Sequence, residues 1–206
     1  MQRSKNSTEE RIIEAAVQLF ARQGFEGGST NQIARLAGVS EVTLFRHFPR
    51  KRDLFWAAVE SRLGRLRIGK ELRSRLENDE DPKTALPAII ASLVETIHHQ
   101  PEMIRLLYLS LFELEHGAER LLRKHLLPFF QPVNEYLSRC NAKGLIRDMQ
   151  PSVAALGLAA CIAGHQGLQF VFPEEQQLSN TDDAAAAYSA FWLKALVSQV
   201  DPEAAV

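Results

Sequence analysis

The sequence contains only two cysteines, Cys140 and Cys161, among its 206 residues. Folds that depend on disulfides are rich in cysteine, so this scarcity argues against a disulfide-stapled protein. The amino terminus also lacks an apolar signal segment, and together the two observations favour a cytoplasmic location. We assign no local acid–base partner to either cysteine, and no glycine-rich phosphate loop or serine elbow occurs. The sequence therefore gives little support to catalysis, and we expect no cofactor.

The sequence also lacks the alternation of polar and apolar residues that is typical of strands. Its long apolar segments repeat with helical period instead, which predicts an all-α fold of about nine helices. One segment, residues 153–172, carries no charge and is long enough to cross a bilayer. Glycine, histidine and glutamine residues make it a poor lipid-facing helix, so we expect a core helix and no membrane.

Metal ligands have one weak candidate cluster in the sequence. Glu95 and His99 share a helix face by spacing, with His98 and Glu102 beside them. The paired histidines are followed by a helix break and have no cysteine nearby, so a solvated surface is the simpler interpretation. We therefore expect no metal site.

Charge is distributed unevenly along the chain. The formal net charge is -1, but residues 1–66 contain 11 Lys+Arg against 7 Asp+Glu, or +4. The remaining residues contain 24 - 11 = 13 basic and 25 - 7 = 18 acidic residues, or -5. A basic amino-terminal region on an acidic body is typical of a small module that faces phosphates.

That basic region contains a helix-turn-helix pattern over residues 29–48, STNQIARLAGVSEVTLFRHF. Ser29 predicts a cap for a helix that starts at Thr30, Gly38 permits a left-handed turn, and Ser40 caps a second helix. An ordinary helical hairpin is the alternative interpretation. A hairpin buried in a core would not need several polar side chains on so short a second helix, so we favour DNA binding.

The same region contains a longer set of residues: Gly24-Phe25, Ile33-Ala34, Ala37-Gly38-Val39-Ser40, Thr43-Leu44, His47-Phe48, Lys51 and Leu54. In this set the sequence resembles the TetR family of bacterial transcriptional regulators. It departs from the family pattern at Gly28, where threonine is usual, at Phe45, where tyrosine is usual, and at Arg50, where a small capping residue is usual.

The resemblance implies which side chains face double-stranded DNA. Thr30, His47 and Lys51 are expected to hold phosphate, and Asn31, Glu41, Val42 and Thr43 are better candidates for base edges. The complete set of expected DNA-binding residues is Thr30, Asn31, Ser40, Glu41, Val42, Thr43, Phe45, Arg46, His47 and Lys51.

The rest of the chain predicts further helices. The first helix covers residues 8–23, and a fourth runs from Lys51 through the basic residues up to Lys70. Residues 76–85 read as a loop, and apolar segments of helical period follow, with Pro128 and Pro132 inside a long helix over residues 119–142. We therefore expect a DNA-binding domain at residues 1–66 and a ligand-binding and dimerisation domain at residues 67–206.

The two carboxy-terminal helices are more apolar than a monomer of this length needs. Together with the family resemblance, this predicts a homodimer interface that includes Ala160, Gly164, Tyr188 and Phe191. The alternative is that both helices complete the core of a monomer.

The resemblance also implies that a small-molecule effector binds in the domain of residues 67–206 and causes the protein to release its DNA. The kinked segment around Pro128 and the aromatic residues suggest an apolar or amphipathic ligand held by Tyr108, Phe112, Phe129, Phe130 and His165. Aromatic residues at helical spacing are also common in plain cores. A second class of function remains open: a helical enzyme or carrier protein with a vestigial DNA-binding head.

Overall fold

The computed structural model describes residues 7–78, 81–112, 118–171 and 181–197. The predicted all-α fold is confirmed, because the regular elements of these residues are helices and their only β-bridge, Ile146 to Val197, is isolated. The chain forms two compact units. Unit 1 comprises Met1–Leu66 and Gln100–Leu126, and unit 2 comprises Arg67–His99 and Leu127–Val206. The sequence alone had suggested a division after residue 66 and had assigned residues 100–126 to the body.

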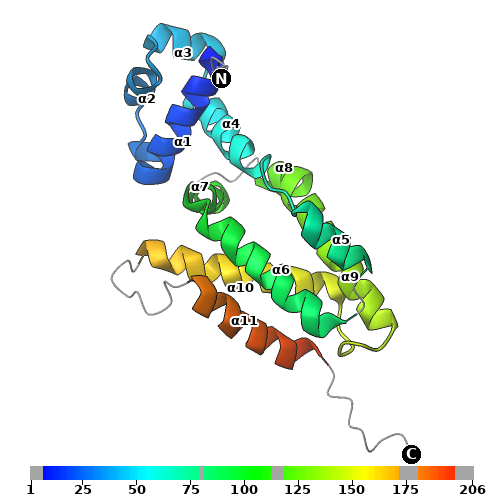
Figure 1. Ribbon diagram of the computed structural model, residues 1–206. Coiled ribbons are helices and arrows are strands. Elements are labelled where there is room, and N and C mark those ends of the chain that lie inside the picture. Colours follow the sequence, from blue (N-terminus) through cyan, green and yellow to red (C-terminus); the bar gives the residue numbers. More distant parts are fainter. Residues whose placement is uncertain (1–6, 79–80, 113–117, 172–180, 198–206) are drawn as a thin grey trace, which may run out of the picture. The chain divides into compact units, whose positions relative to one another are not determined.

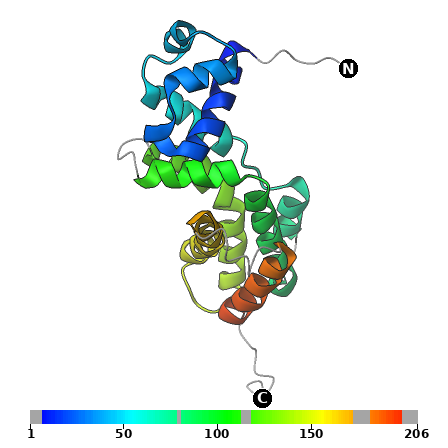
Figure 2. The ribbon, with the colours of Figure 1, turned by 90° about the vertical axis from the view of Figure 1, so that its left-hand side faces the viewer.

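Unit 1 is built around helix α1 (Thr8–Gly27), which packs against α2 (Thr30–Ala37), α4 (Lys51–Leu63) and α7 (Pro101–Phe112). Helix α3 (Glu41–His47) packs on α2, and α8 (Ala118–Leu121) leads into the π-helical turn η1 (Leu122–Leu126). Figure 2 shows α7, in green, next to α1, in blue, and running across it. Fully buried apolar side chains from α1 to α4 form the core of the first four helices: Ile12, Phe20, Ile33, Leu44, Leu54 and Phe55.

Local signals in the sequence set the helix ends of unit 1. Ser7 and Glu10 make a reciprocal capping box at the start of α1. Gly24 interrupts that helix with φ 74°, where the sequence predicted its end, and one more turn follows to Gly27. Ser29 Oγ accepts a hydrogen bond from the Gln32 backbone N–H and starts α2.

The predicted fourth helix is shorter than expected, and the prediction that it continues to Lys70 is wrong. Helix α4 ends at Leu63, and a separate helix, α5 (Lys70–Asn78), begins after a connection that contains Gly64 and Gly69. Glycine has a low helix propensity, which explains the break. The predicted loop at residues 76–85 is correspondingly shorter, since α6 starts at Pro82.

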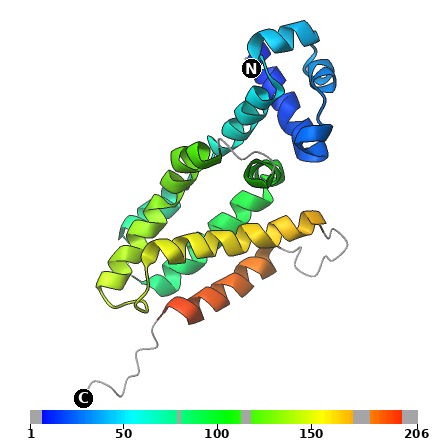
Figure 3. The same ribbon diagram turned by 180° about the vertical axis from the view of Figure 1, so that it is seen from behind.

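Unit 2 contains α5, α6 (Pro82–His98), α9 (Leu127–Ala142), α10 (Pro151–Val171) and α11 (Thr181–Leu196). Helix α6 packs against α11 and α10, and α9 packs against α10 and α5 (Figures 1 and 3). Asp81 caps α6 by accepting from the Lys83 N–H, and Pro82 occupies the first turn, where its missing N–H costs nothing. The core of unit 2 includes Leu86, Ile89, Ile90, Tyr136 and Leu137.

Helix α10 contains most of the uncharged segment 153–172, whose length alone would allow a membrane span. Its buried side chains Ala154, Ala155, Leu158 and Ile162 lie on one face. Across the residues that the structure describes, no helix combines the length and the apolarity that a bilayer crossing requires.

Candidate nucleic-acid interface

Helices α2 and α3 meet at a turn that the sequence specifies closely. Gly38 adopts the left-handed conformation, with φ 67° and ψ 40°, and its N–H bonds back to the last turn of α2. Ala34 and Leu44 are buried where the two helices cross. Ser40 Oγ accepts from the Thr43 N–H at 3.1 Å and lies 2.9 Å from the Thr43 hydroxyl oxygen. The start of α3 is therefore held by a cap that also orients Thr43.

The outer face of this helix pair exposes apolar side chains. Val42 on α3 is 80% exposed, and Leu36 and Phe45 are also among the exposed large apolar residues. A seven-residue helix that turns valine and phenylalanine to solvent has not placed them for its own core. The exposed position of Val42 suits contact with a thymine methyl group.

Polar side chains of α2 and α3 are already bonded to one another. The Thr30 hydroxyl donates to Glu41 Oε1 at 2.6 Å, and Asn31 Nδ2 lies 3.4 Å from Glu41 Oε2. Arg35 Nη2 donates to Asn31 Oδ1 at 3.0 Å. We call these hydrogen-bonded side chains the Glu41 cluster. The cluster fixes the rotamers of three expected DNA contacts, Thr30, Asn31 and Glu41. Arg35 is not among the expected DNA-binding residues, although its spacing of four residues from Asn31 on a helix indicates that the two side chains are neighbours.

The expected phosphate ligands at the end of the motif also have partners within unit 1. Lys51 Nζ donates to the Glu26 carbonyl at 3.0 Å and lies 4.8 Å from the centroid of the Phe25 ring. His47 Nδ1 is 3.9 Å from a carboxylate oxygen of Glu9. A lysine ammonium has three donors, so Lys51 can bind a phosphate while it keeps the carbonyl contact.

Two departures from the family pattern have structural explanations. Arg50 makes two hydrogen bonds to the Asp53 carboxylate, which lower the pKa of Asp53, so it stabilises the start of α4 without a side-chain cap. Gly28 is buried, and a Cβ atom there would lie 2.6 Å from Cδ1 of Phe20. The Phe20 ring therefore occupies the space that a larger residue at position 28 would need.

The expected ligand residues are distributed over both units. Tyr108 belongs to unit 1, where burial raises the pKa of its hydroxyl, and Phe112 ends α7 with a side chain outside the described part. Phe129 and Phe130 lie in unit 2 with ring centroids 4.9 Å apart. The ring centroids of His165 and Tyr188 are 5.8 Å apart, so a residue expected in the ligand site contacts a residue expected in the dimer interface.

Helix α10 exposes an apolar stripe on the side away from its buried face. Val153, Leu156 and Leu168 are each 57–58% exposed, and Ala160 lies between them on the same side. Apart from the backbone of its own helix, no atom of the described residues lies within 4 Å of the place that a Cβ would take at Gly164. On α11, Phe191 is 61% exposed, and the Tyr188 hydroxyl is 3.4 Å from the Cys161 carbonyl of α10.

The structure does not assemble the weak metal candidate. Glu95, His98 and His99 belong to unit 2, whereas Glu102 belongs to unit 1 and pairs with Arg62. No group of three or more potential ligands with metal-site geometry occurs among the described residues.

Comparisons with known proteins agree with the resemblance seen in the sequence. Residues 12–58 match the family described as bacterial regulatory proteins, tetR family. The chain is 28% identical over 166 residues to the HTH-type transcriptional regulator AcrR of Shigella flexneri, covering 76% of this chain and 75% of that one. It is 29% identical over 146 residues to the HTH-type transcriptional repressor NicS of Pseudomonas putida, covering 68% and 66%.

One solved structure with a similar fold is the transcriptional regulator FadR of Bacillus subtilis in complex with stearoyl-CoA. The TM-score is 0.65 at 16% identity, over 88% of this chain and 96% of that one.

Proposed function

Because this chain belongs to the TetR family of bacterial transcriptional regulators, we propose that it is a repressor that binds an inverted-repeat DNA operator as a homodimer and is released by a small apolar or amphipathic ligand. The observation that carries the proposal is the outer face of α2 and α3, where the Glu41 cluster and the exposed Val42 lie on one short helix pair. The repressor assignment draws on the relative named as a repressor.

Base reading is assigned to Asn31, Glu41, Val42 and Thr43. Glu41 can accept from a cytosine amine, and an asparagine can read adenine with two hydrogen bonds. Both side chains are occupied within the Glu41 cluster, so reading a base means exchanging a protein hydrogen bond for one to DNA. Such an exchange is favourable only when the base offers the matching donor or acceptor, which favours specificity over raw affinity.

Phosphate binding is assigned to Thr30, His47 and Lys51, with Ser40, Phe45 and Arg46 on the same surface. Phe45 lacks the hydroxyl with which a tyrosine would bind a phosphate oxygen. Arg46 is exposed at the end of α3 and supplies a positive charge there.

Dimerisation is assigned to the apolar stripe of α10 together with Phe191 and Tyr188 of α11. Supporting this, Val153, Leu156 and Leu168 would otherwise remain in water. The open space beside Gly164 permits close approach of a second helix. Two DNA-binding domains held in this way would present their α3 helices to half-sites about one turn of DNA apart, roughly 34–36 Å or a somewhat larger separation.

Selection of bound sequences from a random DNA pool tests the proposal. We expect an inverted repeat, because a two-fold dimer binds a two-fold site. Enrichment of an asymmetric single site would contradict the dimer, and no enrichment at all would contradict sequence-specific binding.

The ligand class is tested by thermal shift with stearoyl-CoA, the molecule bound to the similar FadR, and with free CoA as the matched control. A ligand that binds the folded chain at 100 times its Kd stabilises it by about 2.7 kcal/mol. We expect stearoyl-CoA to raise the Tm and to lower the affinity for the selected DNA. By linkage the same DNA must weaken stearoyl-CoA binding by the same factor, so equal binding of stearoyl-CoA to the free and to the DNA-bound protein would contradict release by this ligand.

A further inference from the structure

Arg62, in the last turn of α4, is the buried charged residue of the described chain. Its side chain is 8% exposed, and the only other polar residue classed with the core there is Ser110, which bonds to the Leu107 carbonyl of its own helix. An arginine removed from water must be neutralised by partners, and a buried ion pair of this kind is weak evidence of added stability.

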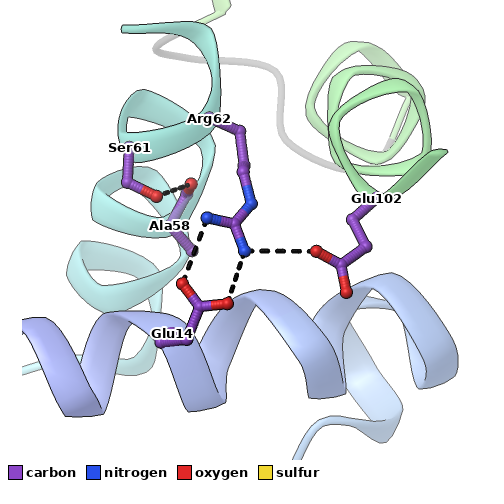
Figure 4. A network of polar contacts seen from close by, with 5 residues as sticks. All are labelled: Glu14, Ala58, Ser61, Arg62 and Glu102. Atoms are coloured by element: carbon purple, nitrogen blue, oxygen red, sulfur yellow. Dashed lines mark hydrogen bonds and ion pairs between the residues drawn. The ribbon is translucent and has the colours of Figure 1, made fainter. Parts of the chain in front are cut away.

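The partners of Arg62 come from two other helices (Figure 4). Nη1 donates to Oε2 of Glu14 at 3.1 Å, and Nη2 donates to Oε1 of Glu14 at 2.7 Å. Nη2 also donates to Oε2 of Glu102 at 3.1 Å. Arg62 therefore joins α4 to α1 through Glu14 and to α7 through Glu102.

The two carboxylates have different roles in this network. Glu14 alone neutralises the guanidinium and holds it through two parallel bonds, which is the strong geometry of this pair. The Glu102 side chain is 43% exposed, so water can solvate its carboxylate when the bond to Arg62 is broken. The contact to α7 can thus open while the buried charge stays paired.

A second polar contact joins the same part of α4 to the other end of the segment. Lys124 of η1 donates to Glu60 Oε1, and His125 Nε2 lies 3.5 Å from the same oxygen. The segment Gln100–Leu126 belongs to unit 1, whereas the residues on both sides of it in the sequence belong to unit 2. The ends of this segment are covalent connections between the units.

We propose that Arg62 and Glu102 form a latch that holds α7 to the DNA-binding head, and that its opening lowers the affinity for a two-half-site operator. The inference rests on the proposed function. A packed network of this kind has two discrete arrangements, in which its bonds are either made or broken. A displacement of α7 that breaks the Arg62–Glu102 bond would therefore leave helices α1–α4, the DNA-binding head, freer to change orientation. Opening leaves the α2–α3 surface intact, because neither Arg62 nor its partners belong to it. Arg62 is accordingly a positioning residue.

The test compares Glu102→Ala with Glu119→Ala. Both glutamates lie in the first turn of a helix of unit 1 and both pair with an arginine, but the Glu119–Arg123 pair is an exposed contact within one helical run. Glu102→Gln serves as an intermediate variant, since a neutral amide oxygen accepts a weaker bond from arginine.

Two quantities are measured for each variant. The first is hydrogen exchange of the α7 amides, which reports local opening without DNA or ligand. The second is the ratio of the affinities for the full inverted repeat and for one half-site. For Glu102→Ala we expect faster α7 exchange and a fall in the ratio of about 2- to 30-fold, with unchanged half-site affinity. Glu119→Ala should match the wild-type protein in both measurements.

Wild-type exchange in α7 together with a wild-type ratio for Glu102→Ala would overturn the latch. Faster exchange with an unchanged ratio would show that Glu102 only stabilises unit 1, and would also overturn it. A wild-type chain that selects no DNA would instead overturn the proposed function, and the exchange measurement would still decide whether Glu102 holds α7.

Discussion

Replacement of Gly28 by alanine tests whether the Phe20 ring is the reason for glycine at this position. Gly28 has φ -73° and ψ 95°, a conformation that alanine adopts readily, so the backbone does not require glycine. Space does. A Cβ atom at position 28 would lie 2.6 Å from Cδ1 and 2.9 Å from Cε1 of Phe20. Carbon atoms in contact lie about 3.5–4.0 Å apart, so the ring or the backbone must move.

The surroundings of Phe20 leave little room for that movement. The ring is fully buried, and its centroid lies 5.9 Å from that of Phe25 and 5.3 Å from that of Phe55. Inserting a methyl group into a packed core costs about 1–3 kcal/mol. For a chain of this length, each kcal/mol corresponds to roughly 2–4 °C, so the Tm should fall by about 2–12 °C.

Thermal and urea unfolding at one fixed protein concentration measure the effect. Gly69→Ala is the control for crowding, because no described atom beyond its chain neighbours lies within 4 Å of the place of a Cβ at that position; any effect there reports helix propensity and not a clash. Phe20→Leu should partly rescue Gly28→Ala, so the double variant should be more stable than the two single effects predict by addition. Wild-type stability of Gly28→Ala, or strict additivity with Phe20→Leu, would refute the steric explanation.

Other residues give further expected outcomes. Ser40→Ala removes the cap of α3 and should cost about 0.5–2 kcal/mol in urea unfolding, and no loss would mean that the cap is redundant. The hydrogen bonds from Arg62 lower the pKa of Glu14 below its ordinary value of 4.5. Their contribution to the free energy of unfolding is therefore present above pH 4.5 and is lost as the pH falls through the lower pKa of the folded state. Glu14→Gln should accordingly flatten the acid side of a plot of stability against pH. Thr43→Ala should relax sequence preference, whereas Lys51→Ala should weaken binding to every duplex and reduce the salt slope by about 1; equal effects on specific and random DNA in both variants would contradict these roles. No described atom crowds a side chain at position 164 within one chain, so Gly164→Leu should weaken the proposed dimer in sedimentation without unfolding the chain, and an unchanged stable dimer would exclude this part of α10 from the interface.

The starts of the first three helices of unit 1 and the turn between α2 and α3 were predictable because their signals are local. A serine cap, a glycine that can take positive φ and a nearby apolar residue act over three or four residues, as at Ser7, Gly24 and Gly38. The all-α class was predictable for the same reason, because the helical spacing of apolar residues identifies the buried face of a helix without any knowledge of what packs against it.

The contacts that organise the candidate site were beyond such signals. Arg62 lies in a basic run and reads as a solvated residue, because its partners Glu14 and Glu102 are 48 and 40 positions away in the sequence. Glu41 was expected to face DNA, but its bond to Thr30 joins two helices across a turn. Pairing across helices depends on side-chain direction in the folded chain, which a single sequence does not specify.

The ends of α4 illustrate a different difficulty. Apolar and basic residues at helical spacing continue past Leu63, so periodicity favours one long helix. Gly64 and Gly69 each destabilise a continuous helix by roughly 1 kcal/mol relative to alanine, and the residues from one glycine to the other are not helical. A breaking residue thus outweighed the pattern around it.

The carboxylate of Glu41 also has a consequence for the time that the protein spends on wrong DNA. In the proposed complex with a duplex that lacks a matching amino group, this negative charge would face phosphates and base acceptors, and breaking its hydrogen bond to Thr30 would gain no bond to a base. Each non-cognate complex should therefore dissociate quickly. A genome offers about 10⁶–10⁹ competing sites, so short residence on each of them shortens the search and leaves more protein free to find its operator.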